Sequence, residues 1–209
     1  MRLTLPKIYP ITDRQLSGLS HAEQVERLID GGATFIQLRE KHMSPIDFLG
    51  EAEAAAKVAD NNSVTLIIND RVDIAMAIGA RGVHLGQDDM PVEAARSLVR
   101  DDALIGFSTH TQQQMEAAVR QPIDYVAFGP VFTTRTKQDP DPTVGLEQLR
   151  AVKNIAAEVP LVAIGGITAA NVQAVLQAGA DSVAVIASVV GEPSKIEQNM
   201  RRMLELAGV

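Results

Sequence analysis

The sequence contains no cysteine and no tryptophan, and aromatic residues make up only 3% of the chain. Without cysteine there can be no disulfide framework, thiolate metal site or cysteine nucleophile. So few aromatic side chains also argue against the stacking platforms that bind nucleic-acid bases. The net charge of −7 at pH 7 disfavours a general polyanion binder, although it is compatible with a local basic pocket. We therefore expect no nucleic-acid partner.

Long apolar runs are missing as well. No stretch of about 18 apolar residues occurs, and the first six residues lack the apolar segment of a secretory signal. We expect a cytoplasmic protein without a membrane partner. Hydrophobic residues nevertheless make up 46% of the 209 residues, which is enough for a large core of Val, Ile, Leu and Ala. Such a core suits helices packed on a parallel sheet, and the length suits one domain, 1–209.

Short apolar runs with strand character recur along the chain, and most are followed by a helical pattern. Strands are predicted at 7–12, from 34 onward, and at 64–69, 82–85, 103–108, 124–129, 161–164 and 182–186. Helices are predicted at 20–30, 44–62, 91–99, 111–119, 144–157, 171–178 and 194–206. Eight β-then-α units predict an α/β protein with a single-domain (β/α)8 TIM barrel, and an open doubly wound sheet is the alternative.

In such a barrel the functional side chains stand at the carboxyl ends of the strands. Polar, charged or glycine residues follow nearly every predicted strand, whereas the opposite ends carry mostly turn glycines and alanines. This asymmetry is typical of a catalytic face. The residues after the strands are Thr12-Asp13-Arg14, Arg39-Glu40-Lys41, Asn69-Asp70-Arg71, Gly86-Gln87-Asp88-Asp89, Ser108-Thr109-His110, Gly129-Pro130, Gly165-Gly166 and Ala187-Ser188.

The second predicted strand ends in three polar side chains, Gln37, Arg39 and Lys41, which share one face of an extended chain. Because an unpaired charge is costly away from water, either this strand frays into solvent or its end is an anion site. Asp70 and Asp89 close the next two strands, where their carboxylates could share Mg²⁺ with a substrate phosphate. Helix caps or solvated loop acids are the alternative. Two cations and a divalent metal would together balance a diphosphate.

Two further strand ends suggest a phosphate site. Gly165-Gly166 and Ala187-Ser188 follow strands seven and eight, where barrels bind a phosphate monoester through backbone N–H groups. A glycine turn that needs only a positive φ is the alternative. The loop from 131 to 142 is the longest on this face, and we expect it either to close over a substrate or to be a solvated connector.

The four histidines receive separate predictions. His84 lies inside a predicted strand and is expected to be a hydrogen-bonded core residue. His21 and His42 are expected at the surface, and only His110 is expected near the site.

Seven motifs in chain order resemble the thiamine phosphate synthase family, also described as thiamine-phosphate pyrophosphorylases. They span most of the chain, and the combination is far more specific than any single piece. The motifs are Tyr9-Pro10-Ile11-Thr12-Asp13, Gln37-Leu38-Arg39-Glu40-Lys41, Ile68-Asn69-Asp70-Arg71-Val72-Asp73, Gly82-Val83-His84-Leu85-Gly86-Gln87, Phe128-Gly129-Pro130-Val131-Phe132, Thr134-Arg135-Thr136-Lys137 and Ala163-Ile164-Gly165-Gly166-Ile167.

The resemblance implies a barrel that joins hydroxymethylpyrimidine diphosphate to hydroxyethylthiazole phosphate, or to its carboxylated form, by a dissociative Mg²⁺-assisted substitution. The implied products are thiamine phosphate and diphosphate, and the implied partners are small molecules. By resemblance the pyrimidine diphosphate is held by Gln37, Arg39, Lys41, Asn69, Ser108 and Lys137. Of these, the catalytic candidates are Arg39, Lys41, Ser108 and Lys137. Mg²⁺ is assigned to Asp70 and Asp89, and the thiazole phosphate to Thr134, Thr136, Gly166, Ile186 and Ala187.

One position departs from the family pattern, because Ala187 stands where the family often has Ser, and Ser188 comes one residue later. This leaves a hydroxyl contact to the thiazole phosphate open, although backbone N–H groups could bind it instead. Two other functions stay open. A thiazole tautomerase would need neither Mg²⁺ nor diphosphate, and a silent precursor-binding protein would need no chemistry. The oligomeric state, a homo-oligomer included, the preferred thiazole form and the use of a protein general base are also left open.

Overall fold

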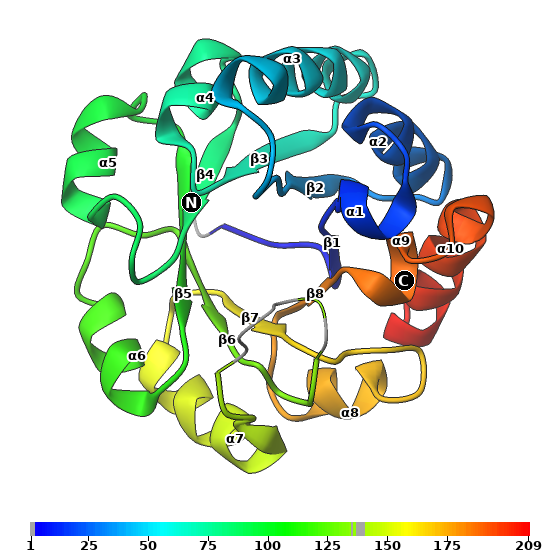
Figure 1. The fold of residues 1–209 in the computed structure, drawn as a ribbon. Coiled ribbons are helices and arrows are strands. Elements are labelled where there is room, and N and C mark those ends of the chain that lie inside the picture. The colour runs from blue at the N-terminus through cyan, green and yellow to red at the C-terminus, as the bar shows by residue number, and fades with distance from the viewer. Residues whose placement is uncertain (1–2, 135, 137–140) are drawn as a thin grey trace.

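The structure is a computed structural model that describes residues 3–134, 136 and 141–209. Its parallel strands form one 8-stranded sheet in the order β1-β8-β7-β6-β5-β4-β3-β2. Figure 1 shows these strands as a ring with the helices around the outside. The strands are β1 (Ile8–Pro10), β2 (Phe35–Leu38), β3 (Thr65–Asn69), β4 (Gly82–Leu85), β5 (Leu104–Thr109), β6 (Tyr125–Phe128), β7 (Leu161–Ile164) and β8 (Ser182–Val185).

The two end strands of the sheet, β1 and β2, meet and close the ring. Ile11 forms a parallel bridge with Gln37, and the N–H of Thr12 donates to the carbonyl of Gln37 at 2.9 Å. The predicted (β/α)8 TIM barrel is therefore confirmed, and the open doubly wound sheet is wrong. All predicted strands form, with small differences at their ends.

The helices agree with the predicted pattern except for three short ones. Ser20 and Thr111 begin α2 and α6 with capping boxes, which satisfy backbone N–H groups at the helix start. The helices α1, α4 and α9, which have four or six residues, are not predicted. The helices are α1 (Arg14–Ser17), α2 (His21–Asp30), α3 (Pro45–Asn61), α4 (Val72–Ala77), α5 (Val92–Leu98), α6 (Gln112–Ala118), α7 (Gly145–Ala156), α8 (Val172–Gln177), α9 (Ala187–Val190), the 3-10 helix η1 (Pro193–Lys195) and α10 (Ile196–Ala207).

The hydrophobic core has two layers, and β2 contributes to both. Ile36 and Leu38 belong to the large cluster that includes the buried faces of the helices. Phe35 belongs to a second cluster with Tyr9 and Tyr125, which come from strands that are not neighbours in the sheet and so meet inside the barrel. The predicted alternation of this strand is therefore confirmed. The inward face of β2 carries Phe35 in the barrel interior and then Gln37 at the carboxyl end of the strand.

Among the helices that the structure describes, none is both long and apolar enough for a membrane crossing.

Candidate active site

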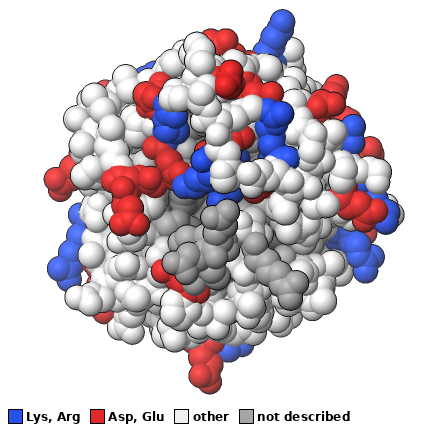
Figure 2. All heavy atoms as spheres, viewed as in Figure 1, with Lys and Arg blue, Asp and Glu red and all other residues white. Residues whose placement is uncertain are grey.

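The carboxyl ends of the strands form one face of the barrel, which we call the mouth. Figure 2 looks onto this face, and Lys, Arg, Asp and Glu side chains crowd its centre and the part where Figure 1 places the ends of β2, β3 and β4. Fewer charged side chains lie over α7 and α8. Among the residues that the structure describes, charge is thus concentrated on the half of the mouth at the ends of β2, β3 and β4.

The end of β2 brings its three predicted side chains to the mouth, each with a partner. Gln37 is buried and donates through Nε2 to the hydroxyl of Tyr9 at 2.7 Å. Arg39 Nη1 lies 3.1 Å from the carboxylate of Asp13. Lys41 forms an ion pair with Asp70. The strand does not fray into solvent, because its polar end is tied to acids of neighbouring loops.

The loop that carries Arg39 and Lys41 is anchored from behind by a buried histidine. Thr12 Oγ1 lies 2.7 Å from His21 Nδ1, and His21 Nε2 lies 3.5 Å from the Glu40 carboxylate. Glu40 also accepts the backbone N–H of residue 42 at 2.7 Å. Glu40 therefore points away from the mouth and holds the loop backbone.

The prediction that His21 lies at the surface is wrong. Its side chain is fully buried, and this burial lowers its pKa. His21 is the first residue of α2 and has polar neighbours in sequence, so its local pattern looks exposed. Only the packing of α2 on α3, with Phe48 near the imidazole ring, encloses it. His42 is exposed, as predicted.

The structure brings Asp70 and Asp89 together at the ends of β3 and β4. Asp89 Oδ2 accepts the N–H of Gly86 at 2.7 Å. Asp70 has a φ of 61°, which is strained for a residue other than glycine, and its N–H donates to the carbonyl of His84 at 2.8 Å. Burial raises the pKa of the Asp70 carboxyl, the ion pair with Lys41 opposes this rise, and the nearby Asp89 carboxylate adds to it.

This pair of acids suits a divalent cation, since two neighbouring carboxylates repel each other and a positive charge between them removes that repulsion. The described residues contain no group of three or more His, Asp or Glu side chains arranged to hold a metal. The donor set among the described residues is thus two carboxylates, which is a number Mg²⁺ commonly takes from a protein when it also binds water and phosphate. The adjacent Asp88 is exposed.

Asn69 and Ser108 stand at the ends of β3 and β5. Asn69 is buried, and its Nδ2 has no hydrogen-bond partner among the described residues. Ser108 Oγ lies 2.8 Å from Nε2 of His84, and Nδ1 of that histidine lies 3.1 Å from the hydroxyl of Tyr125. The prediction of a hydrogen-bonded core His84 is confirmed, and burial lowers its pKa to about 4. Sequence reasoning missed the link between His84 and Ser108.

The other half of the mouth is built mainly from backbone. Gly166 has a φ of 64°, and a Cβ there would lie 2.5 Å from the carbonyl oxygen of Thr133, so no side chain fits. Ile186 precedes α9, which begins at the exposed Ala187. The hydroxyl of Ser188 is buried and has no hydrogen-bond partner among the described residues.

The long loop after β6 is described only in part. The N–H of Thr136 donates to Oγ1 of Thr134 at 3.3 Å. His110 Nδ1 lies 2.7 Å from the carbonyl oxygen of Gly129 and 3.6 Å from the carboxylate of Asp141, so this histidine stands at the foot of the loop. The predicted site residue Lys137 lies outside the described residues.

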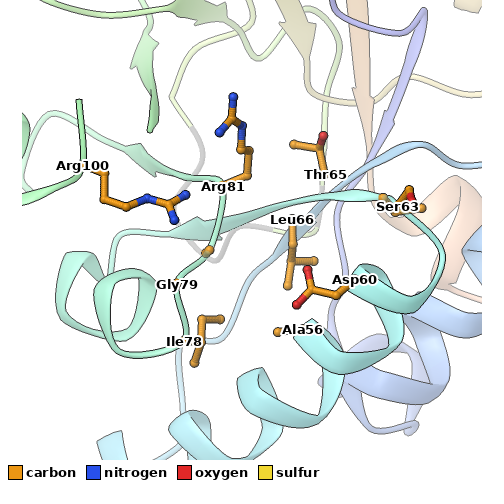
Figure 3. A pocket seen from close by; sticks show the side chains of 11 residues that line it. Ala56, Asp60, Ser63, Thr65, Leu66, Ile78, Gly79, Arg81 and Arg100 are labelled. Atoms are coloured by element: carbon orange, nitrogen blue, oxygen red, sulfur yellow. The ribbon is translucent and has the colours of Figure 1, made fainter. Parts of the chain in front are cut away.

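A hollow of about 230 Å³ lies elsewhere, beside the residues that precede β3 and β4. Figure 3 shows it between Asp60 of α3, Ile78 after α4, and the side chains of Arg81 and Arg100. It is at the amino ends of the strands, and Arg81 already pairs with Asp102 at 2.6 Å. This hollow is therefore separate from the mouth and contains none of the predicted site residues.

Comparisons with known proteins show which family the sequence and the fold match. The sequence model of the family described as "Thiamine monophosphate synthase" matches residues 8–189. The thiamine-phosphate synthase of Koribacter versatilis is 44% identical over 198 residues, which cover 91% of this chain and 92% of that protein. The one from Chloroflexus aurantiacus is 46% identical over 185 residues, covering 88% and 85%. The solved thiamine phosphate pyrophosphorylase from Pyrococcus furiosus superposes with a TM-score of 0.87 at 32% identity, covering 97% and 95%.

Proposed function

Because the chain belongs to the thiamine monophosphate synthase family, we propose that it is a transferase of thiamine biosynthesis that joins hydroxymethylpyrimidine diphosphate to hydroxyethylthiazole phosphate. The products are thiamine phosphate and diphosphate. The observation that carries this proposal is the meeting of Asp70, Asp89 and Lys41 at the ends of neighbouring strands. A divalent cation would balance the two carboxylates, and a polyanion would balance that cation and the lysine.

The charged half of the mouth is proposed to bind the diphosphate. Asp70 and Asp89 would hold Mg²⁺, which when bound supplies positive charge to stabilise the leaving diphosphate. Arg39 and Lys41 add two further cations beside it. At an effective dielectric constant near 20, one contact between unit charges 4 Å apart contributes about 4 kcal/mol. Lys137 is proposed, by resemblance, to join them from the loop.

Departure of diphosphate leaves a cationic pyrimidine methyl group, which the amino-substituted ring stabilises and the thiazole nitrogen then attacks. Gln37, Asn69 and Ser108 are proposed to orient the pyrimidine part. Support comes from Nδ2 of Asn69, which is a buried donor without a described partner. Such a group costs roughly 1–3 kcal/mol, and a hydrogen-bond acceptor on the substrate would offset this cost.

The backbone half of the mouth is proposed to bind the thiazole phosphate. The N–H groups at Gly166 and at the turn of Ile186 and Ala187 would contact the phosphate, with hydroxyl groups of Thr134 and Thr136 beside them. Gly166 lets the loop at Phe132 and Thr133 pack directly against this turn, which supports a position of Thr134 beside the proposed phosphate site.

The proposed partners are these small molecules and Mg²⁺, with no nucleic acid and no membrane, in the cytoplasm. The net charge of −7 and the low aromatic content support the absence of a nucleic-acid partner.

Purified protein mixed with both substrates and Mg²⁺ tests the function. We expect thiamine phosphate and diphosphate to appear in equal amounts, and both to depend on Mg²⁺. A thiazole tautomerase would isomerise its substrate without forming diphosphate, and a binding protein would bind precursors without turnover. Either of those outcomes would overturn the proposal.

A further inference from the structure

We propose that Tyr9, Tyr125 and His84 are positioning residues that fix the hydrogen-bonding sense of Gln37 and Ser108 together, through one chain of hydrogen bonds across the barrel interior. The inference rests on the proposed function, because it gives Gln37 and Ser108 a role toward substrate. It adds three residues that sequence reasoning did not assign to the site.

The chain of hydrogen bonds consists of four consecutive contacts. Nε2 of Gln37 donates to the hydroxyl of Tyr9 at 2.7 Å, and that hydroxyl lies 2.9 Å from the hydroxyl of Tyr125. The Tyr125 hydroxyl lies 3.1 Å from Nδ1 of His84, whose Nε2 lies 2.8 Å from Oγ of Ser108. The ends of β2 and β5, which are not neighbours in the sheet, are thereby connected through side chains of β1, β6 and β4.

The interior around this chain is closed to water. Tyr9 is 1% exposed and Tyr125 is 0% exposed, and the ring centroids of His84 and Tyr125 are 5.5 Å apart. Gly106 of β5 provides the space, since a Cβ there would lie 2.1 Å from Cζ of Tyr125 and 2.4 Å from Nδ1 of His84. Burial raises the pKa of both phenols, so both keep their protons.

With one proton for each hydroxyl, the contacts can be ordered. Tyr9 accepts from Gln37, so its own proton goes to the oxygen of Tyr125, the only other polar contact it has among the described residues. The Tyr125 proton then goes to Nδ1 of His84. A neutral imidazole with an accepting Nδ1 carries its proton on Nε2, which donates to Ser108.

This order leaves the ends of the chain with opposite properties. The hydroxyl proton of Ser108 is free to donate to a ligand, and Oε1 of Gln37, which accepts from none of the described residues, is free to accept. Gln37 and Ser108 together therefore fit a ligand with a hydrogen-bond donor, such as an amino group, beside Gln37. Beside Ser108 the same ligand would have an acceptor, such as a ring nitrogen or a phosphate oxygen. In the opposite order, with Nε2 of Gln37 toward Tyr9 as in this structure, the Tyr9 proton would lack an acceptor and Ser108 would present a lone pair.

Tyr125→Phe tests the inference, since it removes the central hydroxyl and keeps the ring. We expect KM for the pyrimidine diphosphate to rise about tenfold while KM for the thiazole phosphate stays within about twofold, because Gln37 and Ser108 then lose their fixed hydrogen-bonding sense. Phe35→Leu is the matched control. The ring centroid of Phe35 lies 4.7 Å from that of Tyr9, but Phe35 makes none of the hydrogen bonds in the series from Gln37 to Ser108. An equal rise in KM for Phe35→Leu would assign the effect to packing and overturn the inference.

The tautomer of His84 provides a readout that does not need activity. In ¹⁵N spectra of the unaltered protein, we expect neutral His84 to carry its proton on Nε2, and Tyr125→Phe to introduce the Nδ1 tautomer. A proton on Nδ1 in the unaltered protein would overturn the inference even if the enzyme is active. If no diphosphate forms in the activity assay, the proposed function fails, while the spectra still decide the order of the hydrogen bonds.

Discussion

One half of the barrel mouth, at the ends of β2, β3 and β4, consists of charged side chains, whereas the other half, at the ends of β7 and β8, consists mainly of backbone. Lys41 pairs with Asp70 beside Asp89 on the charged half. On the backbone half, Gly166 and Ala187 offer N–H groups and little side chain. The charged half could bind a triply charged diphosphate together with a metal. The backbone half could bind a phosphate monoester through N–H groups.

The two halves also differ in the unfavourable feature that each introduces into the folded protein. The charged half buries Asp70 and holds it close to Asp89, and burial first and the second acid next raise the pKa of Asp70. The backbone half instead requires glycine, because Gly166 has a φ of 64° against the loop carbonyl of Thr133. Substitutions on the charged half should therefore impair chemistry and diphosphate binding, and those on the backbone half should impair binding of the thiazole phosphate.

The largest expected effect is that of Asp89→Ala. Loss of a metal ligand should lower kcat at least about a hundredfold, because transition-state charge is then poorly stabilised. Circular dichroism should show an intact fold. Asp88→Ala is the matched control, because Asp88 is the adjacent, exposed acid. Normal activity of Asp89→Ala with an unchanged Mg²⁺ dependence would refute the metal assignment.

Gly166→Ala should raise KM for the thiazole phosphate more than tenfold and lower the free energy of unfolding by more than about 1 kcal/mol. The methyl group would meet the carbonyl oxygen of Thr133 at 2.5 Å. Gly79→Ala is a close control, since Gly79 has the same φ of 64° but no atom within 4 Å of its Cβ position. If both variants bind the thiazole phosphate normally, the backbone half does not hold it.

Lys41→Ala should raise KM for the pyrimidine diphosphate about tenfold, since a hydrogen bond to a charged group contributes roughly 1.5 kcal/mol or more. KM for the thiazole phosphate should change little. Steady-state kinetics with each substrate varied in turn would measure both. Equal increases for the two substrates would remove the distinction between the halves.

Asp89→Asn should stabilise the protein in the absence of Mg²⁺ by on the order of 1 kcal/mol, because it removes the repulsion by Asp89 that adds to the effect of burial on the pKa of Asp70. A raised pKa in the folded state means that ionisation of Asp70 lowers stability as the pH rises above the ordinary carboxyl pKa, so the gain should shrink in acid. Thermal unfolding with a chelator and then with Mg²⁺ measures this. Mg²⁺ should stabilise only the unaltered protein, and a less stable variant would contradict the account.

The smallest effect is expected for Ser188→Ala. The hydroxyl of Ser188 is buried and makes no hydrogen bond with the described residues. KM for the thiazole phosphate should therefore change by less than about twofold, which corresponds to about 0.4 kcal/mol of binding free energy. A larger rise would show that this serine replaces the hydroxyl that is absent at Ala187.

The fold could be predicted from the sequence because buried parallel strands are short apolar runs with polar ends. The meeting of Asp70 and Asp89 could also be predicted, since parallel strands carry their carboxyl ends to one edge. The contact between His84 and Ser108 could not, because it depends on the register that pairs His84 with Gly106. The burial of His21 depends on the packing of α2 against α3, which no local pattern shows.

The most direct test of the two-halves account is a crystal structure of the protein with Mg²⁺, diphosphate and thiamine phosphate bound. We predict Mg²⁺ at about 2.0–2.1 Å from the carboxylates of Asp70 and Asp89, diphosphate between it and Lys41, and the phosphate monoester of the product against the backbone at Gly166. Diphosphate on the backbone half, or a metal that contacts neither aspartate, would contradict the account.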